Sequence, residues 1–336
     1  MGRRKQNSPR HGSLAYLPRG RARSIAGRIR YWPNVVADSP QLLGFAGYKV
    51  GMSNRYSIND LRGSPSFGQE IDNSVTLIET PPMVVCGFRT YSQTVNGLQS
   101  MMEAWTESPP KELGRVFSLP KIYDTETSLK EIEGALPSVS ELRALLITQP
   151  QMTGLSKKKP ELFEVKVDGG DINSQFSYLK NLLGKEVKVS NVFKEGQPID
   201  LVAITKGKGI QGPVKRWGVK TLPHKSRKTV RGVGTLGAWT PHFVMYTVPR
   251  AGQMGFHQRT EINRKILAIG KSSAETTPKG GYHKYGVVKT DYIVLKGSVI
   301  GPTKRLIKLR YASRPPRTLE VSSEAKQVEV LSSART

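Results

Sequence analysis

The sequence predicts a mainly β protein with an α/β insertion: a closed antiparallel β-barrel, an inserted α-containing lobe and two extended basic extensions. Short apolar and β-branched runs, broken by Gly and Pro, recur along the whole chain with few helical patterns between them. Two stretches are basic and contain no acid, which separates them from the body. With 336 residues and 37% hydrophobic content, the chain can bury a core and form about two domains.

The expected parts follow from changes in composition along the chain. The first stretch is rich in Arg, Gly, Ser and Pro without a sustained period, so we expect an extended arm. The last stretch is polar and contains Pro, so we expect it to fray. The expected parts are an arm over 1–40, a barrel body over 41–91 and 156–311, an inserted lobe over 92–155, a basic finger loop over 206–259, and a tail over 312–336.

Seven runs predict the strands of the body. They are short, rich in Val, Ile, Leu and aromatic residues, and bounded by Gly or Pro. Strands spread over a chain in this way, with few helices between them, are typical of a closed antiparallel barrel. The runs cover residues 42–52, 75–79, 83–88, 163–167, 201–205, 292–295 and 306–309.

Capping signals predict four helices. Ser128 with Glu131, and Ser138 with Glu141, have the capping-box spacing, and Leu142, Leu145 and Leu146 follow as an apolar stripe. These two signals place helices in the lobe over 92–155.

Two further helices are predicted in the body. Asp171 caps a helix that carries Ile172, Phe176, Leu179 and Leu183 on one face before Gly184 ends it. Thr260 caps a helix that carries Ile262, Ile266 and Ile269 and ends at Gly270.

The cysteine count and the N-terminal sequence indicate the cellular compartment in which we expect the protein. Cys86 is the only cysteine, so an intrachain disulfide and a Cys-ligated metal cluster are excluded, and a reducing cytoplasm is expected. The N-terminus is basic but has no apolar h-region, and no run approaches the roughly 20 apolar residues of a membrane span. We therefore expect a soluble protein without a removable signal.

The charge balance predicts a polyanionic partner. The chain holds 52 Lys and Arg against 26 Asp and Glu, a formal net charge of +26. The first 37 residues contain nine Lys or Arg, and residues 206–259 contain eleven, and neither stretch contains an acid. A one-signed segment of this length that also carries Gly, Pro and Trp is suited to lie against nucleic acid.

Catalytic and cofactor sites find little support. Gly207, Gly209 and Gly212 match the G-x-G-x-x-G pattern, but we expect no helix at the third glycine, and no acid appears before Glu261. The five histidines have no metal-binding spacing, and Cys86 lies in an apolar run where a buried, inert thiol is expected. We expect no enzyme activity, no cofactor and no metal.

Aromatic residues within the basic stretch favour folded RNA. Trp217, Trp239, Phe243, Tyr246 and Phe256 offer flat faces for bases, while Lys and Arg neutralise phosphates. A solvated basic face with the aromatics turned into the core is the alternative for any single residue. Trp239 lies between turn residues and is interpreted as the tip of a protruding loop, with a buried Trp as the alternative. The lysines at 157–159 fit an RNA contact or a solvated linker equally well.

Long motifs along the chain resemble the family of universal ribosomal protein three of the large subunit, archaeal type. The matching segments reach from one end of the chain to the other: HGSLAYLPRGRA (11–22), GFAGYKVGM (44–52), ETPPM (79–83), TKGKGIQGPVKRWGV (205–219), GAWTPH (237–242), VPRAGQMGFHQRTEINRKI (248–266) and LKGSVIGPTKRLIKLR (295–310). The inserted lobe and the arm resemble the archaeal and eukaryotic branch more than the bacterial one.

The resemblance implies a barrel of the translation-protein type and a structural role in the large subunit. It implies binding near the 3′ end of the 23S-type rRNA, nucleation of subunit assembly, and a finger loop carrying Trp239 that points toward the peptidyl transferase centre. The implied neighbours are large-subunit proteins of the uL14 and eL24 types. Val230 stands where eukaryotic relatives carry a His that can be methylated, so we expect no such modification.

The residues that we expect to bind rRNA lie in the two basic stretches and just beyond them. They are Arg3, Arg4, Lys5, Arg10, His11, Arg19, Arg21, Arg23, Lys206, Lys208, Lys215, Arg216, Trp217, Lys220, Lys225, Arg227, Lys228, Arg231, Trp239, His242, Arg250, Gln253, His257, Gln258, Arg259 and Arg264. We expect the arm and the finger to be disordered until RNA binds them. A free-standing RNA-modifying enzyme and a general DNA-compacting protein are the rival functions.

Overall fold

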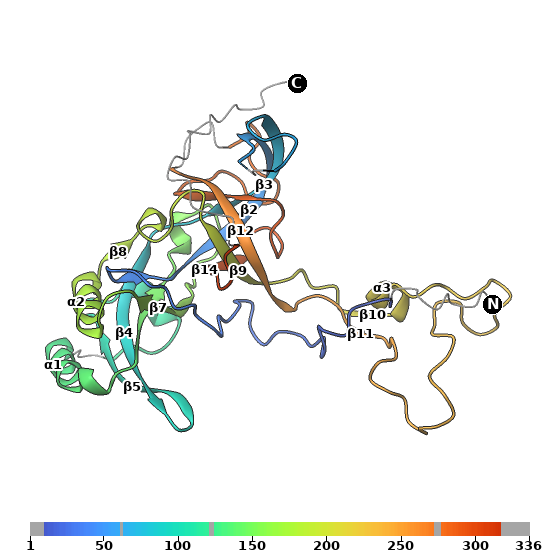
Figure 1. The fold of residues 1–336 in the computed structure, drawn as a ribbon, viewed down its shortest axis with the longest axis horizontal. Coiled ribbons are helices and arrows are strands. Elements are labelled where there is room, and N and C mark those ends of the chain that lie inside the picture. Colours follow the sequence, from blue (N-terminus) through green and yellow to red (C-terminus); the bar gives the residue numbers. More distant parts are fainter. Residues whose placement is uncertain (1–9, 61–62, 121–123, 272–276, 317–336) are drawn as a thin grey trace. The chain divides into compact units, whose positions relative to one another are not determined.

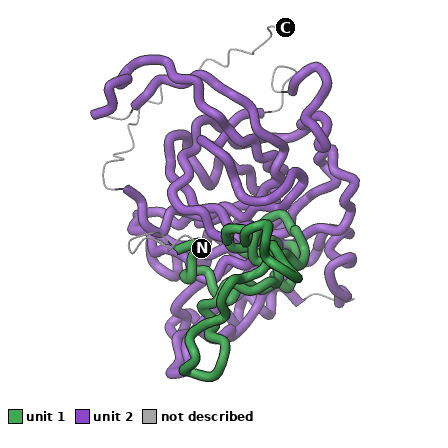
Figure 2. Tube along the Cα trace, turned by 90° about the vertical axis from the view of Figure 1, so that its right-hand side faces the viewer, with its two compact units in different colours: residues 1–25, 204–258 green, residues 26–203, 259–336 purple. Residues whose placement is uncertain are grey.

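The computed structural model describes residues 10–60, 63–120, 124–271 and 277–316. The chain forms two compact units, shown in Figure 2: unit 1 holds residues 1–25 and 204–258, and unit 2 holds residues 26–203 and 259–336. Most elements within the described residues are strands, and few are helices. The expectation of a mainly β chain is therefore confirmed.

The first sheet of unit 2 has six antiparallel strands. β8 pairs with Met83 and Val84 at the start of β4, and the other five strands follow one another without a parallel pair. The strand order is β1 (Gln41–Leu42), β7 (Leu162–Asp168), β6 (Glu141–Ile147), β4 (Met83–Thr94) and β5 (Gly97–Trp105), with β8 at Glu186–Val187.

The second sheet also has six antiparallel strands. Their order is β12 (Gln258–Gly270), β13 (Tyr292–Lys296), β3 (Glu70–Glu79), β2 (Gly44–Ile58), β14 (Leu306–Tyr311) and β9 (Pro198–Ile204). The backbone N–H of Ile266 on β12 donates to Gln197 O at 3.0 Å, directly before β9. The Gly196 N–H donates to Ile266 O at 2.9 Å. The first and the last strand of this order are therefore neighbours as well.

The helices are short: α1 and α2, both labelled in Figure 1, have eleven residues each. α2 (Ile172–Leu182) begins after Asp171 and buries Phe176 and Leu179, and Gly184 follows it with a φ of +77°. The prediction for this helix is confirmed, because a helix commonly ends at a glycine in the left-handed region. The remaining helical elements of unit 2 are α1 (Thr125–Ala135) and the 3-10 helices η1 (Lys111–Arg115), η2 (Leu136–Ser138), η3 (Pro150–Met152) and η4 (Val189–Asn191).

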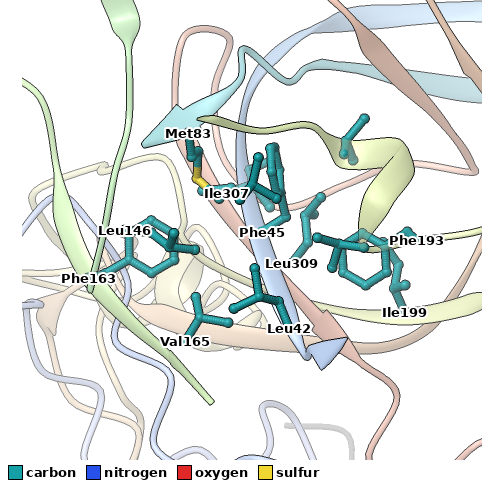
Figure 3. Close-up of a cluster of buried hydrophobic side chains, with 14 of the residues drawn as sticks. Leu42, Phe45, Met83, Leu146, Phe163, Val165, Phe193, Ile199, Ile307 and Leu309 are labelled. Carbon is teal, nitrogen blue, oxygen red and sulfur yellow. The ribbon is translucent and has the colours of Figure 1, made fainter. Parts of the chain in front are cut away.

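A shared hydrophobic core joins the two sheets of unit 2. Figure 3 shows Phe45 and Leu309 of the second sheet near Leu146 and Phe163 of the first. Phe45 and Leu309 are fully buried. Because burial of such side chains removes apolar area from water, this cluster accounts for much of the stability of unit 2.

Each of the seven predicted strand runs lies on or overlaps a strand, but two predicted helices are wrong. The first was placed after Ser138, where β6 begins at Glu141 instead. β6 pairs with β4 on one side and β7 on the other, and it buries residues on both of its faces. A strand buried on both faces reads as a continuous apolar run, which also satisfies helical spacing.

The helix predicted after Thr260 is also a strand, β12. Its register shifts between Ile266 and Ala268, and Asn263 has a positive φ of 56°. A bulge adds a residue and changes which positions share a face. The apolar positions Ile262, Ile266 and Ile269 therefore lose the period of two and match a helical period by chance.

Buried acids in unit 2 have bases or backbone donors as partners. Asp200 is fully buried and accepts hydrogen bonds from Arg310 at 2.9 Å and from the Ser313 backbone at 3.0 Å. Glu79 is fully buried and accepts the backbone N–H groups of Lys289 and Thr290 at 2.8 and 2.9 Å. The negative charges of these two buried carboxylates are thus compensated within the unit.

Two further expectations concern single features. Cys86 is buried, as predicted from the sequence, and burial raises the pKa of its thiol to about 12. Among the described residues, no helix is long and apolar enough to cross a membrane.

Candidate nucleic-acid interface

A two-stranded stem organises the basic stretch of unit 1. β10 (Ile210–Gln211) pairs with β11 (Gly252–Gln253) in antiparallel register. Below this pair, the Lys208 N–H donates to Met254 O, and the Met254 N–H donates to Gly209 O, each at 2.9 Å. These bonds hold two chain segments together that are more than 40 residues apart, and they fix the base of the loop between them.

Gly255 allows the stem to close. Its φ is +73°, and a Cβ at this position would lie 2.1 Å from the carbonyl oxygen of Lys206. Both facts exclude any other residue type without a shift of the backbone. Gly209 also has a positive φ, of +68°, but a Cβ there would meet no atom within 4 Å. Of the three glycines of the KGKGIQG segment, only Gly209 therefore has a backbone conformation that favours glycine, and it is exposed.

A short helix opens at the third glycine of the G-x-G-x-x-G pattern. α3 (Pro213–Trp217) follows Gly212 directly and ends at Gly218, which has a φ of +70°. The expectation that no helix begins here is wrong, because Pro fits the first position of a helix. The helix has only five residues, and no acid follows before Glu261, so the dinucleotide interpretation is still unsupported.

Trp217 lies inside unit 1. Its side chain is 4% exposed, and the guanidinium of Arg19 stacks over the ring at 3.8 Å. The indole N–H donates to the carbonyl oxygen of Arg250 at 2.8 Å. A Cβ on Gly12 would lie 2.3 Å from the ring, so the arm passes directly beside it. The expectation that Trp217 offers a face to a base is therefore corrected: protein atoms already cover it.

Several contacts join the arm to the stem. The His257 Nε2 accepts the Gly255 N–H at 3.0 Å, which leaves Nδ1–H as a donor to Gly20 O at 2.8 Å. The Ala22 N–H donates to Phe256 O at 2.8 Å. Arg10 donates to the carbonyl oxygen of Thr247. Residues 1–25 of the expected arm and residues 206–258 of the expected finger therefore belong to one compact unit (Figure 2).

The loop over residues 218–251 contains no helix or strand and exposes large aromatic side chains. Trp239 is 87% exposed, and Phe243 and Tyr246 are exposed as well. Trp239 meets the ring of His242 edge to face, with the ring centroids 6.0 Å apart. Aromatic residues that are this exposed commonly mark a binding surface, and each base has a face that can stack on them.

The charge of unit 1 has one sign. Of the 52 Lys and Arg residues, 17 lie in residues 1–25 and 204–258, where there is no Asp or Glu. Unit 2 contains the other 35 Lys and Arg residues and all 26 acids. Several of these acids form ion pairs with Arg residues of the same unit. Unit 1 is therefore the part of the protein that lacks an internal counter-charge.

The predicted rRNA-binding residues fall into four groups. Arg3, Arg4 and Lys5 lie outside the described residues. Two are buried: Trp217 and His257. Six are half-buried: Arg19, Arg216, Gln253, Gln258, Arg259 and Arg264. Fifteen are exposed: Arg10, His11, Arg21, Arg23, Lys206, Lys208, Lys215, Lys220, Lys225, Arg227, Lys228, Arg231, Trp239, His242 and Arg250.

Contacts within the protein occupy some of the half-buried group. Arg216 donates to the carbonyl oxygens of Gln253 and Arg250, both at 3.0 Å. Arg264 pairs with Glu261 at 3.5 Å and lies on β12 in unit 2. Two glycines, Gly12 and Gly255, were missing from the predicted site. Only the structure shows the close approaches that require them, because Gly12 meets Trp217 and Gly255 meets Lys206, both far away in the sequence.

A family profile and curated relatives match nearly the whole chain. The profile described as "Ribosomal protein L3" matches residues 1–332. The chain belongs to the ribosomal protein L3 family. This membership agrees with the resemblance stated from the sequence motifs.

Relatives of this L3 family member include archaeal proteins named "Large ribosomal subunit protein uL3". The chain is 48% identical to that of Archaeoglobus fulgidus over 317 residues, which cover 93% of this chain and 94% of the relative. It is 46% identical to that of Pyrobaculum arsenaticum over 333 residues, 98% of each chain. The protein of Methanococcus vannielii is 44% identical over 333 residues, 96% of this chain and 98% of the relative.

Proposed function

We propose that this protein is a structural constituent of the large ribosomal subunit, not an enzyme, and that unit 1 binds the large-subunit rRNA. One observation carries the proposal within this family: unit 1 holds 17 Lys and Arg and no acid. As a ribosomal component the protein acts in the cytoplasm.

The binding mechanism follows from the charges and the aromatic residues. Exposed lysines and arginines replace the counterions around phosphates, and their release favours binding. Trp239, Phe243 and Tyr246 provide faces on which bases stack. The stem closed by β10 and β11 supports the base of the loop, which lowers the ordering cost that binding must offset.

The finer details extend the proposal. The rRNA site lies near the 3′ end of the 23S-type rRNA, binding there nucleates subunit assembly, and the loop with Trp239 reaches toward the peptidyl transferase centre. Neighbouring proteins are of the uL14 and eL24 types. Family resemblance supports these details.

A rigid scaffold completes the proposed architecture. The second sheet closes into a barrel of the translation-protein type, which the bonds between Ile266 and the residues before β9 support. We keep the parts proposed from the sequence, with an arm over 1–40, a body over 41–91 and 156–311, a lobe over 92–155, a finger over 206–259 and a tail over 312–336.

Sucrose-gradient fractionation of a native lysate at low and high salt tests the proposal, with this chain followed by mass spectrometry. We expect the chain to sediment with the large subunit and to resist stripping by high salt. A chain that stays at the top of the gradient would contradict the ribosomal role and favour a free-standing RNA-binding or RNA-modifying protein. Binding of duplex DNA as tightly as rRNA would instead favour a DNA-compacting protein.

A further inference from the structure

The outer half of the β2–β3 hairpin forms a two-stranded ribbon in unit 2 (Figure 1). β14 pairs with β2 only up to Tyr48, and β13 pairs with β3 only from Val75 onward. Beyond these points the two strands pair with each other, as far as Ile58 with Glu70. Within the described strands, the ribbon therefore has no sheet neighbour on either edge.

One side of this ribbon is exposed and carries large apolar residues. Side chains alternate along a strand, and residues opposite each other in an antiparallel pair share a face. Tyr56 lies opposite Asp72, and Ile58 lies opposite Glu70. We call this side the hairpin face, and its residues are Met52, Asn54, Tyr56, Ile58, Glu70, Asp72 and Ser74, all of them exposed.

The apolar residues of the hairpin face are not part of the core. Met52, Tyr56 and Ile58 are each about half exposed, at 50, 49 and 51%. Tyr56 and Ile58 occupy successive alternate positions of β2, and Met52 lies on the same face beyond Asn54. Contiguous apolar rows on a monomer typically mark an interaction site, whereas single exposed apolar residues do not.

The opposite side of the ribbon makes contacts within the protein. Arg55 lies 5.8 Å from the centre of the Tyr292 ring, and the Asn73 side chain donates to Ser57 Oγ at 2.7 Å. The contact of Arg55 reaches Tyr292 on β13, whereas the bond between Asn73 and Ser57 lies within the ribbon. Within the part of the chain that the structure describes, the side chains of the hairpin face are exposed.

The charge of the hairpin face argues against RNA as its partner. Its charged residues are Glu70 and Asp72, and none of its seven residues is a Lys or Arg. Asp72 accepts a hydrogen bond from Asn54 at 3.0 Å, which leaves its negative charge in place. Phosphates brought against two carboxylates repel them, whereas the Lys and Arg of a protein partner are attracted.

We propose that the hairpin face docks a basic protein of the large subunit. Apolar side chains of that partner cover Met52, Tyr56 and Ile58, and its Lys or Arg side chains pair with Glu70 and Asp72. An apolar centre with a charged rim is the usual anatomy of a protein interface. The inference rests on the proposed ribosomal function and adds to it the place and the chemistry of a protein neighbour.

Site-specific crosslinking within the intact subunit tests the proposal. The full-length chain with Tyr56→p-benzoylphenylalanine is assembled into large subunits in cells, and purified, salt-washed subunits are irradiated. We expect the crosslink to join Tyr56 to a Lys- or Arg-rich segment of another protein, identified by mass spectrometry. The matched control is Ser57→p-benzoylphenylalanine on the opposite side, which we expect to give no such product. A crosslink to rRNA, or none, would overturn the proposal.

A charge reversal provides the second measurement. In the crosslinking chain, Glu70→Lys with Asp72→Lys is expected to lower the yield of the protein crosslink by about tenfold. The control pair, Glu126→Lys with Glu133→Lys, reverses exposed acids of α1 and should leave the yield unchanged. If the first variant still sediments with the subunit and its crosslink yield is unchanged, the docking proposal is overturned. Loss of sedimentation by the unsubstituted chain would contradict the ribosomal function instead.

Discussion

Trp217 and Trp239 lie in the same basic unit but have opposite surroundings. Trp217 is 4% exposed, with a guanidinium over its ring, whereas Trp239 is 87% exposed at the loop. The turn residues beside Trp239 correctly predicted an exposed position, whereas nothing in the sequence beside Trp217 predicted its burial. The arm that covers Trp217 lies about 200 positions away in the chain, so this burial depends on a long-range contact.

Trp217→Ala is expected to loosen unit 1. The substitution removes a buried indole and leaves the Arg250 carbonyl oxygen without its donor, which together cost about 3 kcal/mol. Hydrogen exchange measured by mass spectrometry should speed up at the stem amides of Lys208 and Met254, by up to about a hundredfold.

Trp239→Ala is the matched control for that experiment. Its side chain is exposed, so stem exchange should not change, but binding of a large-subunit rRNA fragment should weaken by about tenfold. Faster stem exchange in this variant, or unchanged exchange in Trp217→Ala, would contradict the assignment of the two tryptophans.

Lys308→Met is expected to stabilise the protein at neutral pH. Burial lowers the pKa of Lys308 to about 8, from a usual value of about 10.5. Between about pH 8 and pH 10.5, the unfolded chain of the unsubstituted protein therefore binds more protons than the folded chain. The free energy of unfolding rises with pH in this range. The variant should gain about 1–3 kcal/mol at pH 7, and this gain should shrink as the pH approaches about 10.

Urea unfolding at both pH values measures the effect, with Lys49→Met as the comparison. Burial also lowers the pKa of Lys49, but its ammonium group donates to Gly301 O at 3.0 Å and to Val299 O. Its removal leaves these carbonyl oxygens unpaired, so Lys49→Met should destabilise the protein. A Lys308→Met variant that is less stable than the unsubstituted protein at pH 7 would refute the expectation.

At the scale of elements, short runs bounded by turn residues were correctly predicted as strands. For longer apolar patterns, the sequence did not distinguish a strand from a helix. The runs around β3, β13 and β14 are short and bounded by turn residues, so their type followed from local sequence. β6 and β12 failed for tertiary reasons, one because both of its faces are buried and the other because of a bulge. Local spacing carries no information on either feature.

The stem depends on one glycine, and a neighbouring glycine provides the control. Gly255→Ala places a Cβ 2.1 Å from the Lys206 carbonyl oxygen at a φ of +73°, so the stem must open. Affinity for an rRNA fragment should fall by about tenfold or more, because the loop then has to be ordered on binding.

Gly212→Ala should leave that affinity unchanged. Its φ is −69°, and a Cβ there would meet no atom within 4 Å. Fluorescence anisotropy with the same rRNA fragment compares the two variants. Equal affinities for both would show that stem closure does not contribute to binding.

At the scale of the whole molecule, the two units differ strongly in their charge. Unit 1 has 17 bases without an acid, while unit 2 combines 35 bases with 26 acids. Composition alone predicted where the basic stretches lie. It could not predict that the two stretches form one unit, since that depends on contacts such as His257 with Gly20.

Neutralising lysines of unit 1 should flatten the salt dependence of rRNA binding. Lys220→Gln, Lys225→Gln and Lys228→Gln together should reduce the slope of log affinity against log salt by about two to three, if each contacts a phosphate. The control changes three exposed lysines of unit 2, Lys130, Lys180 and Lys185, to Gln and should leave the slope as it was. Filter binding between about 50 and 200 mM salt measures both, and equal slopes would mean that unit 1 is not the phosphate-binding part.

The contacts of the arm can form only after a delay during synthesis of the chain. Arg19 donates to the carbonyl oxygen of Arg216, which is made 197 residues later. At about 5–20 residues per second, the arm waits on the order of 10–40 s before its partner exists. During that interval it is a bare polycation beside nascent and mature RNA. Premature capture by the wrong nucleic acid is therefore a hazard that a dedicated escort for the newborn N-terminus would remove.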